Sequence, residues 1–319
     1  MEYIDLHAHI GASVPPEELW EIAHSQGIKI PKQYDSFLKA YEVGEKMEHS
    51  EYVIDKFKLT HRIQSSPAAI ERSVFRAIAS AYTKSNVTIM ELRFNPMLRN
   101  MSGHYDLDSI IVSACMGLQK ACMTYPVKAG LIIETDRSFD EKKHLILVKK
   151  ALKYKYLGVV GFDVSGSEQN PNTYDTVKST VRSMNMAYEG GLGITYHTGE
   201  VTSSGEMKYI MENVPVNRIG HGVLATNDQE CINMLRDRSV CLEICPTSNV
   251  KLGIAKSYDE ILNWINIFIT NDVEISINTD GNEYMGITCR SEYSLITKAF
   301  GIDCTKRILD TAKKYSFVK

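Results

Sequence analysis

Short runs of β-branched and aliphatic residues alternate along the chain with longer stretches whose apolar residues recur at helical spacing. In the stretch 257–270, for example, Ile261, Ile265 and Phe268 fall on one stripe, as expected of a helix that lies on a sheet. Strand and helix alternating eight times is typical of a parallel (β/α)8 barrel, an α/β fold. We expect strands at 3–10, 87–94, 127–134, 158–164, 193–197, 217–220, 239–244 and 273–279, with helices at 106–124, 140–155, 173–189, 205–213, 226–237 and 257–270.

One interval departs from this alternation. The segment from Ser13 to Asn86 is long enough for several helices, and Pro15-Pro16-Glu17-Glu18 is typical of a helix start. We therefore expect one TIM-barrel domain, residues 1–319, with a helical insertion at about 14–86. The insertion is a candidate lid over the strand ends.

Length and charge narrow the class of protein. A chain of 319 residues fits one barrel domain. With 36 basic and 39 acidic side chains, it offers no basic field that would attract duplex nucleic acid. Its seven cysteines lie mostly inside apolar runs, which favours buried thiols over a disulfide framework. No apolar run is long enough for a signal peptide or a membrane span, so we expect a cytoplasmic protein without a membrane partner.

Histidines and an aspartate recur where apolar runs end. His7 and His9 close the first expected strand, and alternate residues of a strand face the same side. His197 ends the fifth strand and Asp280 follows the eighth, which becomes a neighbour of the first when a barrel closes. Each residue alone is more often structural. Together they predict one bound metal ion, and these ligands suit zinc as well as other divalent ions.

Two further residues suit a hydrolytic reaction. Bound zinc lowers the pKa of its water to about 7, which supplies a nucleophile. Glu200 lies three residues after His197 and is the candidate proton donor to a substrate ring nitrogen. His221, between two glycines at the end of the sixth strand, is the candidate to orient the hydroxide or to take its proton. The His-Glu-x-x-His and Pro-Cys-x-x-Cys motifs are absent, which argues against the common zinc peptidase and cytidine deaminase sites.

The motifs taken together resemble the adenosine deaminase family of zinc-dependent barrel hydrolases. The resemblance implies that His7, His9, His197 and Asp280 hold zinc, and that the backbone amide of Gly166 binds a purine ring nitrogen. It also implies that Glu200 protonates the ring beside the attacked carbon and that His221 positions the hydroxide. The matching segments, in family order, are His7-Ala8-His9, Glu91-Leu92-Arg93-Phe94, Gly161-Phe162-Asp163 with Gly166 and Glu168, His197-Thr198-Gly199-Glu200, Arg218-Ile219-Gly220-His221-Gly222, Cys245-Pro246-Thr247-Ser248-Asn249 and Asn278-Thr279-Asp280.

Two departures from the family pattern concern the substrate. Gly281 stands where the family usually has a second aspartate. If that missing carboxylate explains an altered specificity, Gly281→Asp should improve activity on adenosine. Gly11 stands where adenosine-specific members carry an acid near the ribose hydroxyl. The missing acid would have repelled phosphate, so a nucleotide becomes compatible, and Ser13 is a candidate hydrogen-bond donor to it. Within these motifs no lysine or arginine clearly replaces the acid, and we expect Arg93 and Arg137 to form structural ion pairs.

Three functions remain open at this point. The first is a zinc-dependent hydrolytic deaminase that converts adenosine, or a modified adenine nucleoside or nucleotide, to the inosine-type product and ammonia. The second keeps the zinc and the fold but acts on another amino-heterocycle or an N6-substituted purine nucleotide. The third is a catalytically silent binding module, which conflicts with the intact set of candidate residues. In each case the partner is a small molecule, and the oligomeric state is not indicated.

Overall fold

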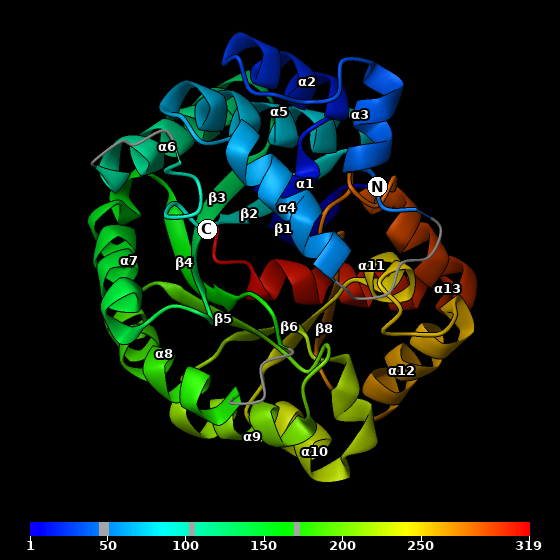
Figure 1. Ribbon diagram of the computed structural model, residues 1–319. Coiled ribbons are helices and arrows are strands. Elements are labelled where there is room, and N and C mark those ends of the chain that lie inside the picture. The colour runs from blue at the N-terminus through cyan, green and yellow to red at the C-terminus, as the bar shows by residue number, and fades with distance from the viewer. Residues whose placement is uncertain (45–50, 102–105, 169–172) are drawn as a thin grey trace.

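Eight parallel strands form the centre of the molecule, and helices surround them (Figure 1). The computed structural model describes residues 1–44, 51–101, 106–168 and 173–319. The strands pair in sequence order, so the predicted (β/α)8 barrel is confirmed. The strands are β1 (Tyr3–His9), β2 (Val87–Phe94), β3 (Lys128–Asp136), β4 (Val159–Ser165), β5 (Gly193–Thr198), β6 (Arg218–His221), β7 (Cys241–Ile244) and β8 (Ile275–Ile277).

The barrel closes between β8 and β1 through both side-chain and backbone contacts. The predicted eighth strand, 273–279, is too long, since β8 spans Ile275–Ile277. The Asn278 N–H still donates to the Ile244 carbonyl of β7 at 2.9 Å, but toward β1 it is the Asn278 side chain whose Oδ1 accepts the Leu6 N–H at 2.9 Å. Beyond it, Asp280 donates its N–H to the His7 carbonyl at 2.8 Å and accepts from the His9 N–H at 2.7 Å. Closure therefore brings Asp280 directly beside the two N-terminal histidines.

The helices begin and end where the sequence provides caps. Ser66 accepts the Ala69 N–H at the start of α5, Pro67 occupies its first turn, and Asn86 ends it in the left-handed conformation. The helix predicted after Pro15 begins at Pro16. The helices are α1 (Ile10–Ser13), α2 (Pro16–Ser25), α3 (Tyr34–Tyr41), α4 (Glu51–Ile63), α5 (Pro67–Ser85), α6 (Leu107–Thr124), α7 (Glu141–Lys153), α8 (Thr173–Glu189), α9 (Ser204–Asn213), α10 (Gln229–Asp237), α11 (Pro246–Lys251), α12 (Tyr258–Thr270) and α13 (Cys289–Tyr315), with 3-10 turns at Lys155–Leu157 and Val223–Asn227.

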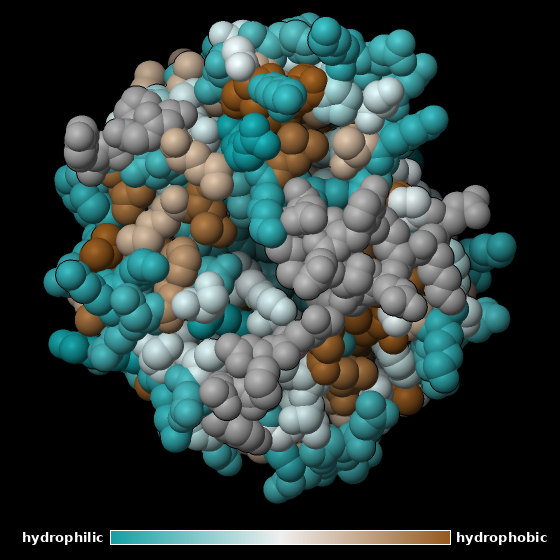
Figure 2. All heavy atoms as spheres, viewed as in Figure 1, coloured by the Kyte–Doolittle hydropathy of each residue, from teal (hydrophilic) through white to brown (hydrophobic). Residues whose placement is uncertain are grey.

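Helix α4 lies against the C-terminal end of β1 (Figure 1). The Phe57 ring packs 6.0 Å from the His9 ring, and just past the helix end Gln64 donates its Nε2–H to the Ile10 carbonyl at 3.3 Å. The segment between β1 and β2 therefore supplies part of the wall beside the strand ends. The same face of the molecule is hollowed near its centre (Figure 2).

The burial of the cysteines and the length of the helices can be compared with the sequence predictions. Six of the seven cysteines are buried, which agrees with a packing role. Among the described helices, none combines the length and the apolar character that a membrane span requires.

Candidate active site

Three imidazoles and one carboxylate converge at the C-terminal ends of β1, β5 and β8. The Nε2 atom of His197 lies 3.1 Å from that of His7 and 3.2 Å from that of His9. The Oδ1 atom of Asp280 lies 3.8 Å from His7 Nε2 and 3.5 Å from His9 Nε2. The structure thus brings together all four residues that the sequence predicted as metal ligands.

A buried carboxylate faces the other ring nitrogen of each of these histidines. Glu243 lies 2.6 Å from His7 Nδ1, Glu134 lies 2.9 Å from His9 Nδ1, and Asp163 lies 3.0 Å from His197 Nδ1. A carboxylate accepts the Nδ1–H and so leaves the Nε2 lone pair directed at the shared point. These carboxylates thus orient each ring for a cation.

The donor set fits a divalent metal ion. Lone pairs on nitrogens about 3 Å apart repel one another unless a cation or a proton lies between them. Imidazole nitrogens together with a carboxylate oxygen are also the ligand types that catalytic zinc prefers. Burial and the Arg93 charge hold the pKa of His7 well below its usual value, so its ring is neutral as a ligand must be. Without a cation, burial lowers the pKa of His197, but Asp163 outweighs this and raises it to about 9.

An ion network beneath the site fixes the carboxylate behind His7. Glu243 accepts from Arg93 at 2.8 Å and from Arg218 at 2.6 Å. Arg93 also pairs with Asp163 at 2.9 Å and Arg218 with Glu91 at 2.7 Å, and all five side chains are fully buried. Burial would raise the pKa of Glu243, but the two arginines lower it to about 2. The ion pair expected for Arg93 is therefore confirmed, and it belongs to the support of the candidate ligands.

The Cys245-Pro246-Thr247-Ser248-Asn249 segment holds two of the candidate residues. Ser248 donates its hydroxyl to Asp280 Oδ2 at 2.6 Å, and Asn249 Nδ2 lies 3.2 Å from His221 Nδ1. Asp280 and His221 both adopt left-handed backbone, with φ of 63° and 60°. Such backbone costs energy in residues other than glycine and is concentrated at functional sites. The sequence analysis named this motif without a role, and the structure shows that it contacts Asp280 and His221.

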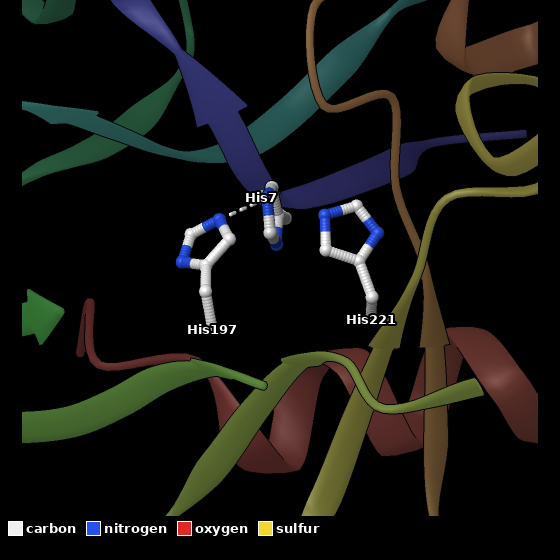
Figure 3. A group of neighbouring side chains, drawn as sticks. All are labelled: His7, His197 and His221. Carbon is white, nitrogen blue, oxygen red and sulfur yellow. Dashed lines mark hydrogen bonds between the residues drawn. The ribbon is translucent and has the colours of Figure 1, made fainter. Parts of the chain in front are cut away.

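Glu200 and His221 lie beside the candidate ligands. The Glu200 carboxylate is 3.8 Å from His221 Nε2, and the His221 ring centroid is 4.9 Å from that of His7. His7, His197 and His221 point toward a common space from their separate strands (Figure 3). A Cβ on Gly220 would come within 3.1 Å of the His7 and His197 rings, so glycine lets these imidazoles approach.

The turn that carries Glu200 is held by buried charges. Glu168 accepts from the backbone N–H groups of Val201 at 2.7 Å and Thr202 at 2.8 Å. Arg137 pairs with Glu206 at 2.7 Å and donates to the His197 carbonyl. The ion pair expected for Arg137 is thus confirmed. It ties the strand end that bears His197 to α9.

The glycines proposed to contact substrate occupy tight positions. Gly166 has φ of 103°, and a Cβ there would lie 3.0 Å from the Asp136 carboxylate. A Cβ on Gly281 would lie 2.2 Å from the Ala12 Cβ, so a carboxylate cannot enter without displacing α1, which argues against the gain in activity expected from Gly281→Asp. Ser13 is fully buried, and within the described residues its Oγ has no hydrogen-bond partner. The substrate contacts of these residues remain predictions.

Of the three carboxylates that face the histidines, the sequence analysis missed Glu134 and Glu243, and it named Asp163 only within a matching segment, without a role. Glu134 ends the apolar run Leu131-Ile132-Ile133 and Glu243 interrupts the run from 240 to 244, yet both are buried. A charge inside an apolar strand is rarely buried unless it is paired, so this pattern was a usable signal. Arg99, which lies beside Gly11, was also missed.

Comparisons with known proteins agree with this geometry. The family model described as "Adenosine deaminase" matches residues 3–319. The adenosine deaminase of Vibrio atlanticus is 29% identical over 313 residues, which cover 98% of this chain and 91% of that protein.

Solved structures share the fold. A COG1816 amidohydrolase from Burkhoderia ambifaria, solved with bound Zn, has a TM-score of 0.87 at 18% identity, covering 100% of this chain and 86% of that one. The Arabidopsis N6-mAMP deaminase has a TM-score of 0.85 at 23% identity, covering 100% and 94%. The match to the family model across nearly the whole length shows that this chain belongs to the adenosine deaminase family.

Proposed function

We propose that the protein is a zinc-dependent hydrolytic deaminase that converts adenosine, or a modified adenine nucleoside or nucleotide, to the inosine-type product and ammonia. The observation that carries the proposal is the convergence of His7, His9 and His197 Nε2 atoms with Asp280, each imidazole backed by a buried carboxylate. The zinc bound in the similar Burkholderia-type amidohydrolase structure supports this choice of metal.

The four ligands would hold one ion, whose chemical contribution is to lower the pKa of water to about 7. The chain's own residues would manage the protons. His221, held by Asn249, would take a proton from the attacking water, and Glu200 would donate a proton to the ring nitrogen beside the amine-bearing carbon. The Gly166 amide would hydrogen-bond another ring nitrogen and so orient the base.

Addition of water across the carbon–nitrogen double bond gives a tetrahedral carbon that bears both oxygen and the amine. Protonation of the ring nitrogen by Glu200 would accompany this addition, because it makes the ring carbon electrophilic. The amine would then take up the proton that His221 removed from water, the carbon–nitrogen bond would break, and ammonia would leave, while the hydroxyl proton returns to Glu200 as the carbonyl forms. Glu200 therefore contributes chiefly in the transition state.

The test is ammonia release from adenosine, 2′-deoxyadenosine, AMP and free adenine. N6-methyl-AMP is tested in the same way, with methylamine measured as the released amine. Glu200→Gln should keep its metal but lose turnover by on the order of 10²-fold or more on the best substrate. Glu212→Gln is the matched control, since Glu212 is exposed at the end of α9 and should behave as the wild type. Turnover by Glu200→Gln near that of the control would contradict the assignment.

A further inference from the structure

Arg99 is a buried arginine for which the described residues supply no carboxylate partner. It is 2% exposed, its Nε donates to Gln64 Oε1 at 3.2 Å, and its Nη1 donates to the Asn95 carbonyl at 3.2 Å. Among the described residues, no hydrogen bond or ion pair engages Nη2. Burial lowers the pKa of Arg99 to about 10, and Glu134, which only partly offsets this, is committed to His9. A buried cation without a counter-ion is costly, so its presence calls for an explanation.

The guanidinium lies beside the candidate active site. A Cβ on Gly11 would be 3.3 Å from Arg99 Nη2, and Gly11 follows the candidate ligand His9 by two residues. Gln64 fixes this arrangement, since its Oε1 accepts from Arg99 while its Nε2 donates to the carbonyl of Ile10. Arg99 is therefore held against the short helix α1 at the rim of the barrel.

Asn95 contributes a second buried donor next to Arg99. Its Oδ1 accepts the backbone N–H groups of Met97 at 2.9 Å and Leu98 at 3.4 Å, which fixes the orientation of the amide. The Nδ2 group is buried and, within the described chain, has no hydrogen-bond partner. The Thr60 hydroxyl lies 2.8 Å from the same Gly11 Cβ position. The Thr60 hydroxyl donates to the Phe57 carbonyl at 3.0 Å, so the donors left for a ligand are Arg99 Nη2 and Asn95 Nδ2, and both suit an anion.

We propose that Arg99 binds an anionic group on the 5′ carbon of the adenine substrate, which makes a nucleoside 5′-monophosphate the preferred substrate class. This inference rests on the proposed deaminase function, because that function places the ribose 5′ end near Gly11. Glycine at position 11 matters for the charge balance. A carboxylate there would neutralise Arg99 and repel phosphate, whereas glycine leaves both the charge and the space to the ligand.

The first test compares kcat/KM for AMP with that for adenosine. The wild type should favour AMP, and Arg99→Gln should lower the AMP-to-adenosine ratio of kcat/KM by about 10- to 100-fold, the range for one charge-assisted hydrogen bond. Arg99→Lys should recover part of the ratio. Arg62→Gln, which removes an exposed positive charge on α4, is the control and should leave the ratio unchanged. Adenosine preferred by the wild type, or an unchanged ratio in Arg99→Gln, would overturn the proposal.

The second test measures equilibrium binding of inosine 5′-monophosphate and of inosine by calorimetry, without turnover. Tighter binding of the monophosphate that is lost in Arg99→Gln but kept in Arg62→Gln would support the anion site. If no adenine compound is deaminated, only the deaminase proposal fails, and this binding result still supports the anion site. Equal binding of both ligands by the wild type would overturn the anion site. Adenosine 5′-carboxylate serves as a further ligand: if Arg99 strengthens its binding more than that of AMP, the 5′-monophosphate assignment is overturned.

Discussion

Replacing Glu134 by glutamine tests whether the carboxylates behind the histidines tune the metal site. Glu134 is buried on β3, and its carboxylate lies 2.9 Å from His9 Nδ1. Glutamine keeps the size and a carbonyl acceptor but removes the charge that makes His9 a stronger ligand. Loss of such a partner weakens metal binding by about 10- to 100-fold, which corresponds to about 1.4 to 2.7 kcal/mol.

The assay is competition for zinc against a chromophoric chelator, with the protein's unfolding temperature in the metal-free state as a check on folding. Glu18→Gln is the matched control, because Glu18 is a largely buried glutamate that pairs with Arg72 and Arg76 on the outer helices. The control should bind zinc as the wild type does. If Glu134→Gln also binds zinc with unchanged affinity, the carboxylate does not act on the metal through His9 and the reasoning fails.

Three other variants or comparisons test separate parts of the account. Free zinc at about 1,000 times its dissociation constant should stabilise the wild type by about 4 kcal/mol. Thermal unfolding with and without chelator measures this gain, which His197→Asn should lose and His221→Asn should keep. Gly281→Asp should lower stability by about 1 to 3 kcal/mol, because the new side chain overlaps Ala12, and it should not raise adenosine turnover. A variant as stable as the wild type with higher adenosine turnover would contradict this prediction. Burial raises the pKa of Glu292 from 4.5 to about 7. The native state therefore keeps a proton that the unfolded chain releases between these values, and the contribution of Glu292 to stability should fall by about 3 kcal/mol as pH rises through that window. Because other buried groups such as Asp5 also titrate there, the test compares the change in unfolding free energy between the two ends of the window in urea. It should be about 3 kcal/mol more unfavourable in the wild type than in Glu292→Gln, and equal changes in both would contradict the assignment.

The barrel and the positions of the candidate ligands were predictable because both follow from local periodicity. A strand shows which residues share a side, so His7 and His9 were paired correctly, and strand order placed Asp280 near them. The end of β8 was not predictable, since the Asn278 side chain takes over from the ladder in closing the barrel.

The partners of these residues could not be predicted, because they depend on contacts between elements distant in sequence. Arg99 meets Gly11 only because Gln64 and the turn after β2 place it there. Gly281 looked like a lost substrate contact, but its lack of a side chain is required by the packing of Ala12. In both cases a glycine is explained by what lies next to it in space.

The most direct test of the central claim is a zinc titration of metal-free protein, followed by ammonia release from AMP and adenosine. The account predicts no turnover without metal and a linear rise that ends at one ion per chain, with His7→Asn and Asp280→Asn failing to reach the plateau. Full turnover in protein freed of metal, or no ammonia from either substrate in protein that has bound one zinc ion per chain, would contradict it.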